Sequence, residues 1–136
     1  MARLEARDLS LRIGARPLLR DLSVAFEAGQ NWAILGANGS GKTTLLHTLA
    51  GLRRPHAGQV LLDGQALSAM VRRHLARRRA VLFQDSEAPF ASSVRDAVLS
   101  GRHPHLTPWQ WESAGDVQYA EQALAAVDMR SYAERM

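Results

Sequence analysis

One short stretch of this sequence decides the fold: Gly36-Ala37-Asn38-Gly39-Ser40-Gly41-Lys42-Thr43. It fits the pattern G-x-x-x-x-G-K-[ST], a loop whose backbone N–H groups surround an anion. Its glycines allow positive φ and leave no Cβ in the way of a ligand. The pattern therefore predicts a phosphate site in which Lys42 reaches the β- and γ-phosphates of a nucleotide and the Thr43 hydroxyl ligates Mg²⁺.

The flanks of this loop match the setting that the pattern requires. The preceding run, Trp32-Ala33-Ile34-Leu35, is short and apolar without alternation, which is typical of a strand buried on both faces. After the loop, leucines recur at helical spacing and predict an amphipathic helix over residues 43–52. The order strand, loop, helix makes a chance match of the glycine-rich turn a poor explanation.

Lysine usage points the same way. The chain has 17 Lys and Arg residues, and its only lysine is Lys42. A compact ammonium thus replaces a planar guanidinium at the one position where the motif asks for it.

Length and composition predict a single domain, and the mixed order of strands and helices favours the α/β class. The chain has 136 residues, of which 46% are hydrophobic and 22% charged, enough for one globular domain. No cysteine is present, which excludes disulfides and thiolate metal sites. No apolar run approaches the roughly 20 residues that a membrane span needs. The expected elements are an antiparallel strand pair at 9–13 and 22–26, strands at 32–35, 60–62 and 80–83, and helices at 43–52, from Ser68 through Val71 and Leu75, at 93–99 and at 117–127.

Ordered landmarks along the chain resemble the ATP-binding subunits of ABC transporters. They comprise the strand pair, the loop at 36–43, Leu49-Ala50-Gly51-Leu52, Pro55, Gly58, Leu62-Asp63-Gly64 and Arg79-Ala80-Val81-Leu82-Phe83-Gln84. The later segment, Gly101-Arg102-His103-Pro104-His105 with Trp109 and Trp111, is similar to importer ATPases that serve siderophore, haem or cobalamin systems. The resemblance implies a P-loop NTPase core with an N-terminal antiparallel strand pair and the start of a helical subdomain.

The resemblance covers residues 1–136 but reaches only about the first half of such a domain, so we expect an incomplete ABC ATPase domain. The phosphate loop (Walker A) and the Q-loop are present, whereas the signature, the Walker B strand and the switch histidine are absent. The family hydrolyses ATP to drive transport, and we expect this chain alone to be inactive.

Site residues are carried over from the family position by position. Lys42 and Gln84 take catalytic roles, and Thr43 and Gln84 are expected to hold Mg²⁺. Ile13 stands where many relatives place an aromatic that stacks on adenine, and offers only aliphatic contact. The residues expected to bind ATP are Gly36, Asn38, Gly39, Ser40, Gly41, Lys42, Thr43, Thr44 and Ile13.

The resemblance also implies partners and a location. It implies membrane permease subunits, a second copy of the ATPase subunit in the complete protein, and indirectly a periplasmic binding protein. The expected location is cytoplasmic, on the inner face of the cell membrane. No nucleic acid is expected, because the arginines near 72–79 are explained by a solvated helix face.

Other functions remain open at this point. A P-loop kinase or GTPase would use Asp85 as its metal ligand, a soluble ABC protein would act on ribosomes or DNA, and a gene fragment would have no function. Leu99-Ser100-Gly101 begins like the family signature but comes too soon after Gln84, and it is expected to end a helix at a glycine cap.

The later aromatic and histidine residues carry two smaller predictions. His103 and His105 are expected to belong to a docking loop, because a metal site would need a third ligand. Of Trp109 and Trp111, one is expected to be buried and the other to face a partner.

Overall fold

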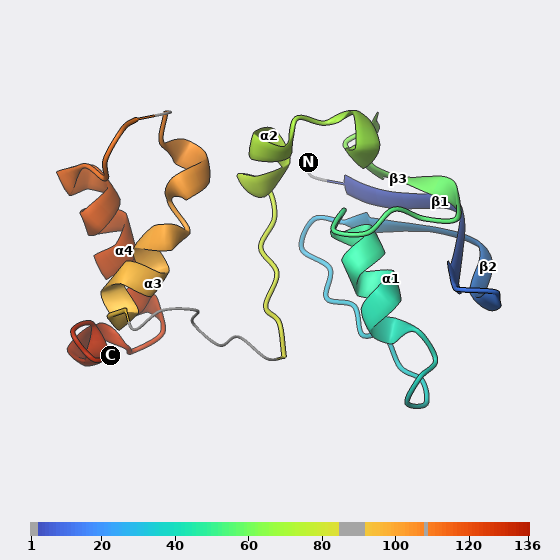
Figure 1. Cartoon of the computed structure of the whole chain (residues 1–136), viewed down its shortest axis with the longest axis horizontal. Helices are drawn as coiled ribbons and strands as arrows, with labels where there is room; N and C mark the ends of the chain where they lie inside the picture. Colours follow the sequence, from blue (N-terminus) through green and yellow to red (C-terminus); the bar gives the residue numbers. More distant parts are fainter. Residues whose placement is uncertain (1–2, 85–91, 108) are drawn as a thin grey trace. The chain divides into compact units, whose positions relative to one another are not determined.

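A four-stranded antiparallel sheet forms the centre of the first of two compact units, Met1–Leu75 and Ala76–Met136 (Figure 1). The computed structural model describes residues 3–84, 92–107 and 109–136. The strand order is β2-β1-β3-β4, and the strands are β1 (Arg3–Ile13), β2 (Arg16–Glu27), β3 (Ala57–Leu62) and β4 (Gln65–Ala66). The predicted strand pair and the strand and turn at 60–64 are confirmed, and the pair is longer than its alternating core.

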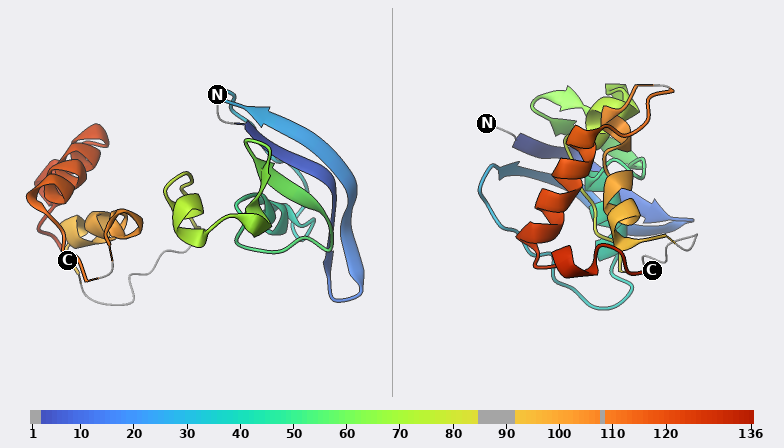
Figure 2. Two further views of the ribbon diagram at one scale, coloured as in Figure 1. Left: turned by 90° about the horizontal axis from the view of Figure 1, so that it is seen from above. Right: turned by 90° about the vertical axis from the view of Figure 1, so that its left-hand side faces the viewer.

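The two long strands of this sheet are joined by matching irregularities. Asp8 in β1 and Asp21 in β2 both adopt positive φ, 49° and 50°, and the strand register shifts on both sides of the Leu9–Leu22 pair. The Asp8 N–H donates to Ser23 Oγ at 2.9 Å, and the Asp21 N–H donates to Ser10 Oγ at 3.0 Å. Each hydroxyl in turn donates to the carboxylate of the same aspartate, at 3.2 Å. These paired bulges accompany the bend of the hairpin in Figure 2.

Helix α1 (Lys42–Leu49) packs against β1 and closes the core of the first unit. The predicted helix is confirmed, although it ends before Leu52. Its Leu49 joins the buried side chains of the sheet, and Leu45 and Leu18 pack against them. The buried core consists of Ala6, Leu9, Leu11, Leu49 and Val60.

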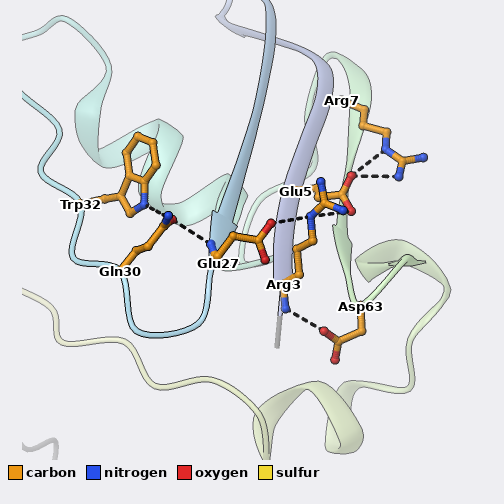
Figure 3. A network of polar contacts seen from close by, with 7 residues as sticks. All are labelled: Arg3, Glu5, Arg7, Glu27, Gln30, Trp32 and Asp63. Carbon is orange, nitrogen blue, oxygen red and sulfur yellow. Dashed lines mark hydrogen bonds and ion pairs between the residues drawn. The ribbon is translucent and has the colours of Figure 1, made fainter. Parts of the chain in front are cut away.

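The expected strand at 32–35 is not formed. Residues 30–37 have no regular structure, with Trp32 56% and Leu35 90% exposed. Figure 3 shows how the segment starts: Gln30 Oε1 accepts the Glu27 N–H and the Trp32 indole N–H, each at 2.9 Å. A strand buried on both faces needs a hydrogen-bonding neighbour, and the sheet of the described residues offers none beside this run.

A buried carboxylate ties the start of the sheet together (Figure 3). Glu5 is 9% exposed and forms ion pairs with Arg3 at 3.4 Å and Arg7 at 2.9 Å. Arg3 also reaches Glu27 of β2 at 3.0 Å, so the network joins β1 to its neighbour.

The helix expected from Ser68 is replaced by two short pieces. Ser68 lies inside the 3-10 turn η1 (Leu67–Ala69), and the helix α2 covers only Arg72–Ala76. Met70 is extended, with φ −79° and ψ 140°, and therefore interrupts the helix. Leu67 packs against the core of the sheet, which accounts for the turn staying there. Leu75 is buried as predicted, whereas Val71 is exposed.

Two helices dominate the second unit, α3 (Val94–Ser100) and α4 (Ala114–Ala126). Both are predicted, and both begin with a capping box in which a serine, Ser93 or Ser113, accepts the N–H of an aspartate three residues later. Gly101 ends α3, as expected. The 3-10 turns η2 (His103–His105) and η3 (Arg130–Tyr132) complete the unit.

Two expectations for the second unit are wrong. Residues 80–83 form no strand, and Leu82 is 94% exposed, because no neighbouring strand is present in the described part of this unit. Trp109 and Trp111 are both exposed, at 99% and 86%, instead of one being buried. In this region Arg102 donates to the buried Asp116 at 2.8 Å and lies over the ring of the exposed Tyr119.

Among the described residues, no helix combines the length and the apolar character that a membrane span requires.

Candidate functional site

The loop at residues 36–43 has the backbone shape that its glycines were expected to permit. Gly39 and Gly41 adopt φ of 76° and 96°, which L side chains rarely adopt. A Cβ on Gly39 would meet nothing within 4 Å, so the space beside it is open. The Ser40 N–H donates to the Ala37 carbonyl at 3.2 Å and closes the turn.

Lys42 folds its side chain back over this loop. Its ammonium nitrogen lies 2.8 Å from both the Gly36 and the Ala37 carbonyl oxygens. A lysine ammonium has three N–H donors, so one remains after these two bonds. The loop therefore holds a positive charge at its mouth, with a donor left for a ligand oxygen.

The start of helix α1 differs from the starts of α3 and α4. Gly41 is its N-cap, no side chain caps it, and no acidic residue lies in its first turn. The other two helices each have a serine cap and an aspartate there. The positive end of the α1 dipole is thus left for an anion, which is the arrangement found in phosphate loops.

The hydroxyl residues after the lysine occupy the first turn of α1. Thr43 is exposed, so its hydroxyl is accessible to a metal ion. Thr44 is partly buried, and its carbonyl accepts the Thr48 hydroxyl at 2.8 Å. Asn38 and Ser40 are exposed on the loop. Hydroxyl and phosphate oxygens are ligands that Mg²⁺ prefers, so the residues present fit a Mg²⁺–nucleotide.

Sequence reasoning missed the residue that supports the loop from behind. A Cβ on Gly41 would lie 2.9 Å from Leu18 Cδ1, so β2 packs directly under the helix start. The apolar positions at 18 and 19 in the second strand are the only signal that pointed to it. Ile13 ends β1 in register with Arg16 and is half-exposed.

Gln84 belongs to the second unit and is exposed. The strand expected at 80–83, just before Gln84, is absent, so the role of Gln84 rests on the order of landmarks alone. Asp85, the metal ligand of the kinase alternative, lies outside the described residues. Across the described ranges, no group of three or more His, Cys, Asp or Glu could hold a metal ion. The docking role expected for His103 and His105 stays a prediction. The turn that holds them accepts the Arg77 Nε–H through the Pro104 carbonyl at 2.8 Å.

Comparison with known proteins identifies the family. The family model described as ABC transporter matches residues 19–136. The chain is 39% identical over 134 residues to the petrobactin import ATP-binding protein of Bacillus anthracis, covering 97% of this chain and 48% of that protein. It is 42% identical over 132 residues to the hemin import ATP-binding protein of Pseudomonas entomophila, covering 97% and 50%.

Solved structures agree. A metal-chelate type ABC transporter in an inward-facing conformation matches with a TM-score of 0.75 and 28% identity, covering 98% of this chain and 48% of the other. A nucleotide-free ATP-binding cassette matches with a TM-score of 0.80 at 22% identity, covering 99% and 57%, which supports the fold alone. The chain spans about half the length of the curated relatives it matches. This chain therefore belongs to the ATP-binding proteins of the ABC transporter family.

Proposed function

We propose that this chain is the N-terminal part of the ATP-binding subunit of an ABC importer, and that ATP hydrolysis by the complete subunit energises uptake of a metal chelate. The observation that carries the proposal is the Lys42 ammonium held over an uncapped helix start. The loop binds ATP through its phosphates, because backbone N–H groups and a fixed cation suit a polyphosphate better than a neutral ligand.

The proposed roles follow from the donors available. Lys42 directs its remaining N–H toward the β- and γ-phosphates, and the N–H groups at the start of α1 hold the phosphate oxygens. Thr43 contributes a hydroxyl to Mg²⁺, and Gln84 an amide oxygen to the same ion or to the attacking water. When bound, Mg²⁺ offsets the negative charge that develops during phosphoryl transfer. Ile13 gives the adenine an aliphatic contact only.

Hydrolysis needs more than this chain supplies. A phosphate cradle stabilises charge, but a carboxylate that activates the attacking water is also required, and no such carboxylate is assigned within residues 1–136. We therefore propose that turnover requires the remaining half of the domain and a second copy of the subunit. Phosphate release by this chain should not exceed that of a Lys42→Ala variant, and release that depended on Lys42 would contradict the proposal.

The substrate class is taken from the relatives. One is named for petrobactin import, one for hemin import, and a third, from Bacillus subtilis, for iron(3+)-hydroxamate import at 34% identity. An iron chelate is their shared chemistry. We propose membrane permease subunits as direct partners on the inner face of the membrane, with a periplasmic binding protein delivering the chelate to them.

The kinase or GTPase alternative is not favoured, because the matching family model is that of ABC transporters and the relatives are named as import ATP-binding proteins. Asp85 is therefore not assigned as a metal ligand.

The experiment that tests ATP binding is calorimetric titration of this chain with Mg²⁺–ATP. Lys42→Ala should weaken binding at least tenfold, about 1.4 kcal/mol, because the fixed cation is lost. Arg54→Ala is the matched control, since it removes one exposed cation outside the loop and should leave the affinity unchanged. If both variants lost the same affinity for Mg²⁺–ATP, the loss would reflect net charge alone. If Lys42→Ala lost no affinity, the phosphate-site assignment would be wrong.

A further inference from the structure

A cavity lies in the first unit, away from the loop at 36–43, where the hairpin of β1 and β2 meets the start of β3. Its volume is about 390 Å³, within the range of small-ligand sites. It contains no residue of the loop at 36–43, and Ile13 does not line it. Its polar lining residues are Ser10, Arg12, Arg20, Asp21 and His56.

The cavity carries an excess of positive charge. Arg12 and Arg20 line it, and among the described residues neither forms an ion pair. By contrast, Arg3 and Arg7 in the same sheet both pair with Glu5. The single acid of the lining, Asp21, accepts the Ser10 hydroxyl at 3.2 Å. The lining therefore contains two guanidinium groups and one carboxylate, and that carboxylate already has a partner.

Hydrogen bonds hold the backbone around the cavity in place. The His56 N–H donates to the Ser10 carbonyl at 2.9 Å, and the Asp21 N–H donates to Ser10 Oγ at 3.0 Å. The Arg53 guanidinium donates to the Arg12 carbonyl at 3.2 Å, which brings another positive charge to the rim. Sites built on strands hold their side chains more accurately than sites on loops.

The chemistry of the lining selects the ligand. Guanidinium groups match phosphate oxygens with two parallel N–H donors, and they remain charged at any physiological pH. The His56 imidazole in the same lining adds a ring N–H donor. A cationic ligand would meet two unpaired arginines, and an apolar ligand would leave them without partners.

We propose that this cavity is a second anion site, distinct from the nucleotide loop, which binds a phosphate-bearing ligand through Arg12 and Arg20. The phosphate could belong to a free polyphosphate or to the headgroup of an anionic lipid, and the chemistry of recognition is the same.

The test uses pyrophosphate as the probe and the Lys42→Ala variant as the background, so that the nucleotide loop is already impaired. Calorimetry should still detect pyrophosphate binding in Lys42→Ala. Adding Arg12→Gln or Arg20→Gln should weaken that binding at least tenfold. Arg16→Gln is the matched control, because Arg16 is exposed on the same hairpin but does not line the cavity. If, in the Lys42→Ala background, Arg16→Gln weakened pyrophosphate binding as much as Arg12→Gln, the proposal would be overturned.

A second arm distinguishes the two sources of phosphate. Sedimentation with phosphatidylglycerol vesicles, compared with phosphatidylcholine vesicles, should depend on Arg12 and Arg20 if the ligand is a lipid headgroup. Pyrophosphate binding with the same dependence, and no vesicle binding, assigns a soluble ligand. If neither pyrophosphate nor vesicle binding depends on these two arginines, the site does not exist. Retained Mg²⁺–ATP binding by Arg12→Gln and Arg20→Gln in a chain with native Lys42 verifies that each variant is folded.

Discussion

Replacing Gly58 by alanine should destabilise the first unit strongly, for two separate reasons. Gly58 has φ +75°, which costs an L residue about 1–2 kcal/mol. Its Cβ would also lie 2.2 Å from the Asp8 carbonyl oxygen and 2.4 Å from the Arg7 carbonyl oxygen. Both are backbone atoms in the bulge of β1, so a flexible side chain cannot move aside. Forced overpacking of this kind costs about 1–3 kcal/mol, giving about 2–5 kcal/mol in total.

Gly64 supplies the control that separates strain from contact. It has φ +79°, almost the same as Gly58, but a Cβ there would meet nothing within 4 Å. Gly64→Ala should therefore cost only the conformational part, about 1–2 kcal/mol. The assay is urea unfolding of both variants, followed by circular dichroism and compared at equal m-values. Equal free energies of unfolding for the two variants would refute the clash, and with it the close approach of β3 to the bulge.

Three further outcomes are expected. Thr43→Ala should reduce the Mg²⁺-dependent part of ATP affinity about tenfold while leaving metal-free ATP binding unchanged, as measured by titration with and without EDTA. The Ser113 hydroxyl and N–H and the Arg102 guanidinium hold the pKa of Asp116 below its usual range. Since the folded-state pKa is depressed, the carboxylate stabilises the fold above its unfolded pKa of about 4, and this contribution is lost as pH falls toward the folded-state value. Asp116→Asn should thus lower stability at pH 7 and flatten the acid limb of a thermal-melting series, whereas an unchanged acid limb would show that the carboxylate contributes nothing. In the full-length subunit with its permease in proteoliposomes, Gln84→Ala should keep ATP affinity within about twofold but lower chelate-stimulated hydrolysis, and undiminished stimulation would remove the Q-loop assignment.

The parts of the fold that rest on local signals were predictable from the sequence. The helices predicted at 93–99 and 117–127 are observed as α3 and α4, the second beginning three residues earlier, and the alternating residues of 9–13 and 22–26 mark the hairpin. Helix α1 follows from its leucine spacing. These elements satisfy most of their own backbone hydrogen bonds or pair with the adjacent strand, so nearby residues are enough to specify them.

The failed predictions at 32–35, at 80–83 and at the two tryptophans share one physical cause. The runs at 32–35 and 80–83 have the apolar composition of buried strands, but a strand exists only where a neighbour pairs with it. Composition does not reveal whether that neighbour is present. The same limit applies to Trp109 and Trp111, whose exposure depends on what packs against them. The helix predicted from Ser68 is wrong for a different reason. Met70, between Ser68 and Arg72, is extended, and nothing in the sequence indicates that conformation.

The candidate site also combines features with a local sequence signal and features that depend on tertiary packing. The glycine pattern is local, and it predicted the positive φ values of Gly39 and Gly41. The phosphate contacts expected of Lys42 stay a prediction. Leu18, which supports Gly41 from another strand, became visible only in three dimensions. Gln84 stays a prediction, since it depends on the order of landmarks and not on geometry near the loop.

The reciprocal Asp–Ser hydrogen bonds of the hairpin specify the register of β1 against β2. The same four residues occur twice, as Arg7-Asp8-Leu9-Ser10 and Arg20-Asp21-Leu22-Ser23, and each aspartate finds the serine of the other copy. Antiparallel strands are related by a local two-fold axis, so one tetrapeptide written twice encodes both halves of the contact. A shift of either strand by one residue would break the Asp8–Ser23 and the Asp21–Ser10 contacts together, so no shifted register keeps one of them. Misaligned hairpins are therefore rejected as a whole during folding.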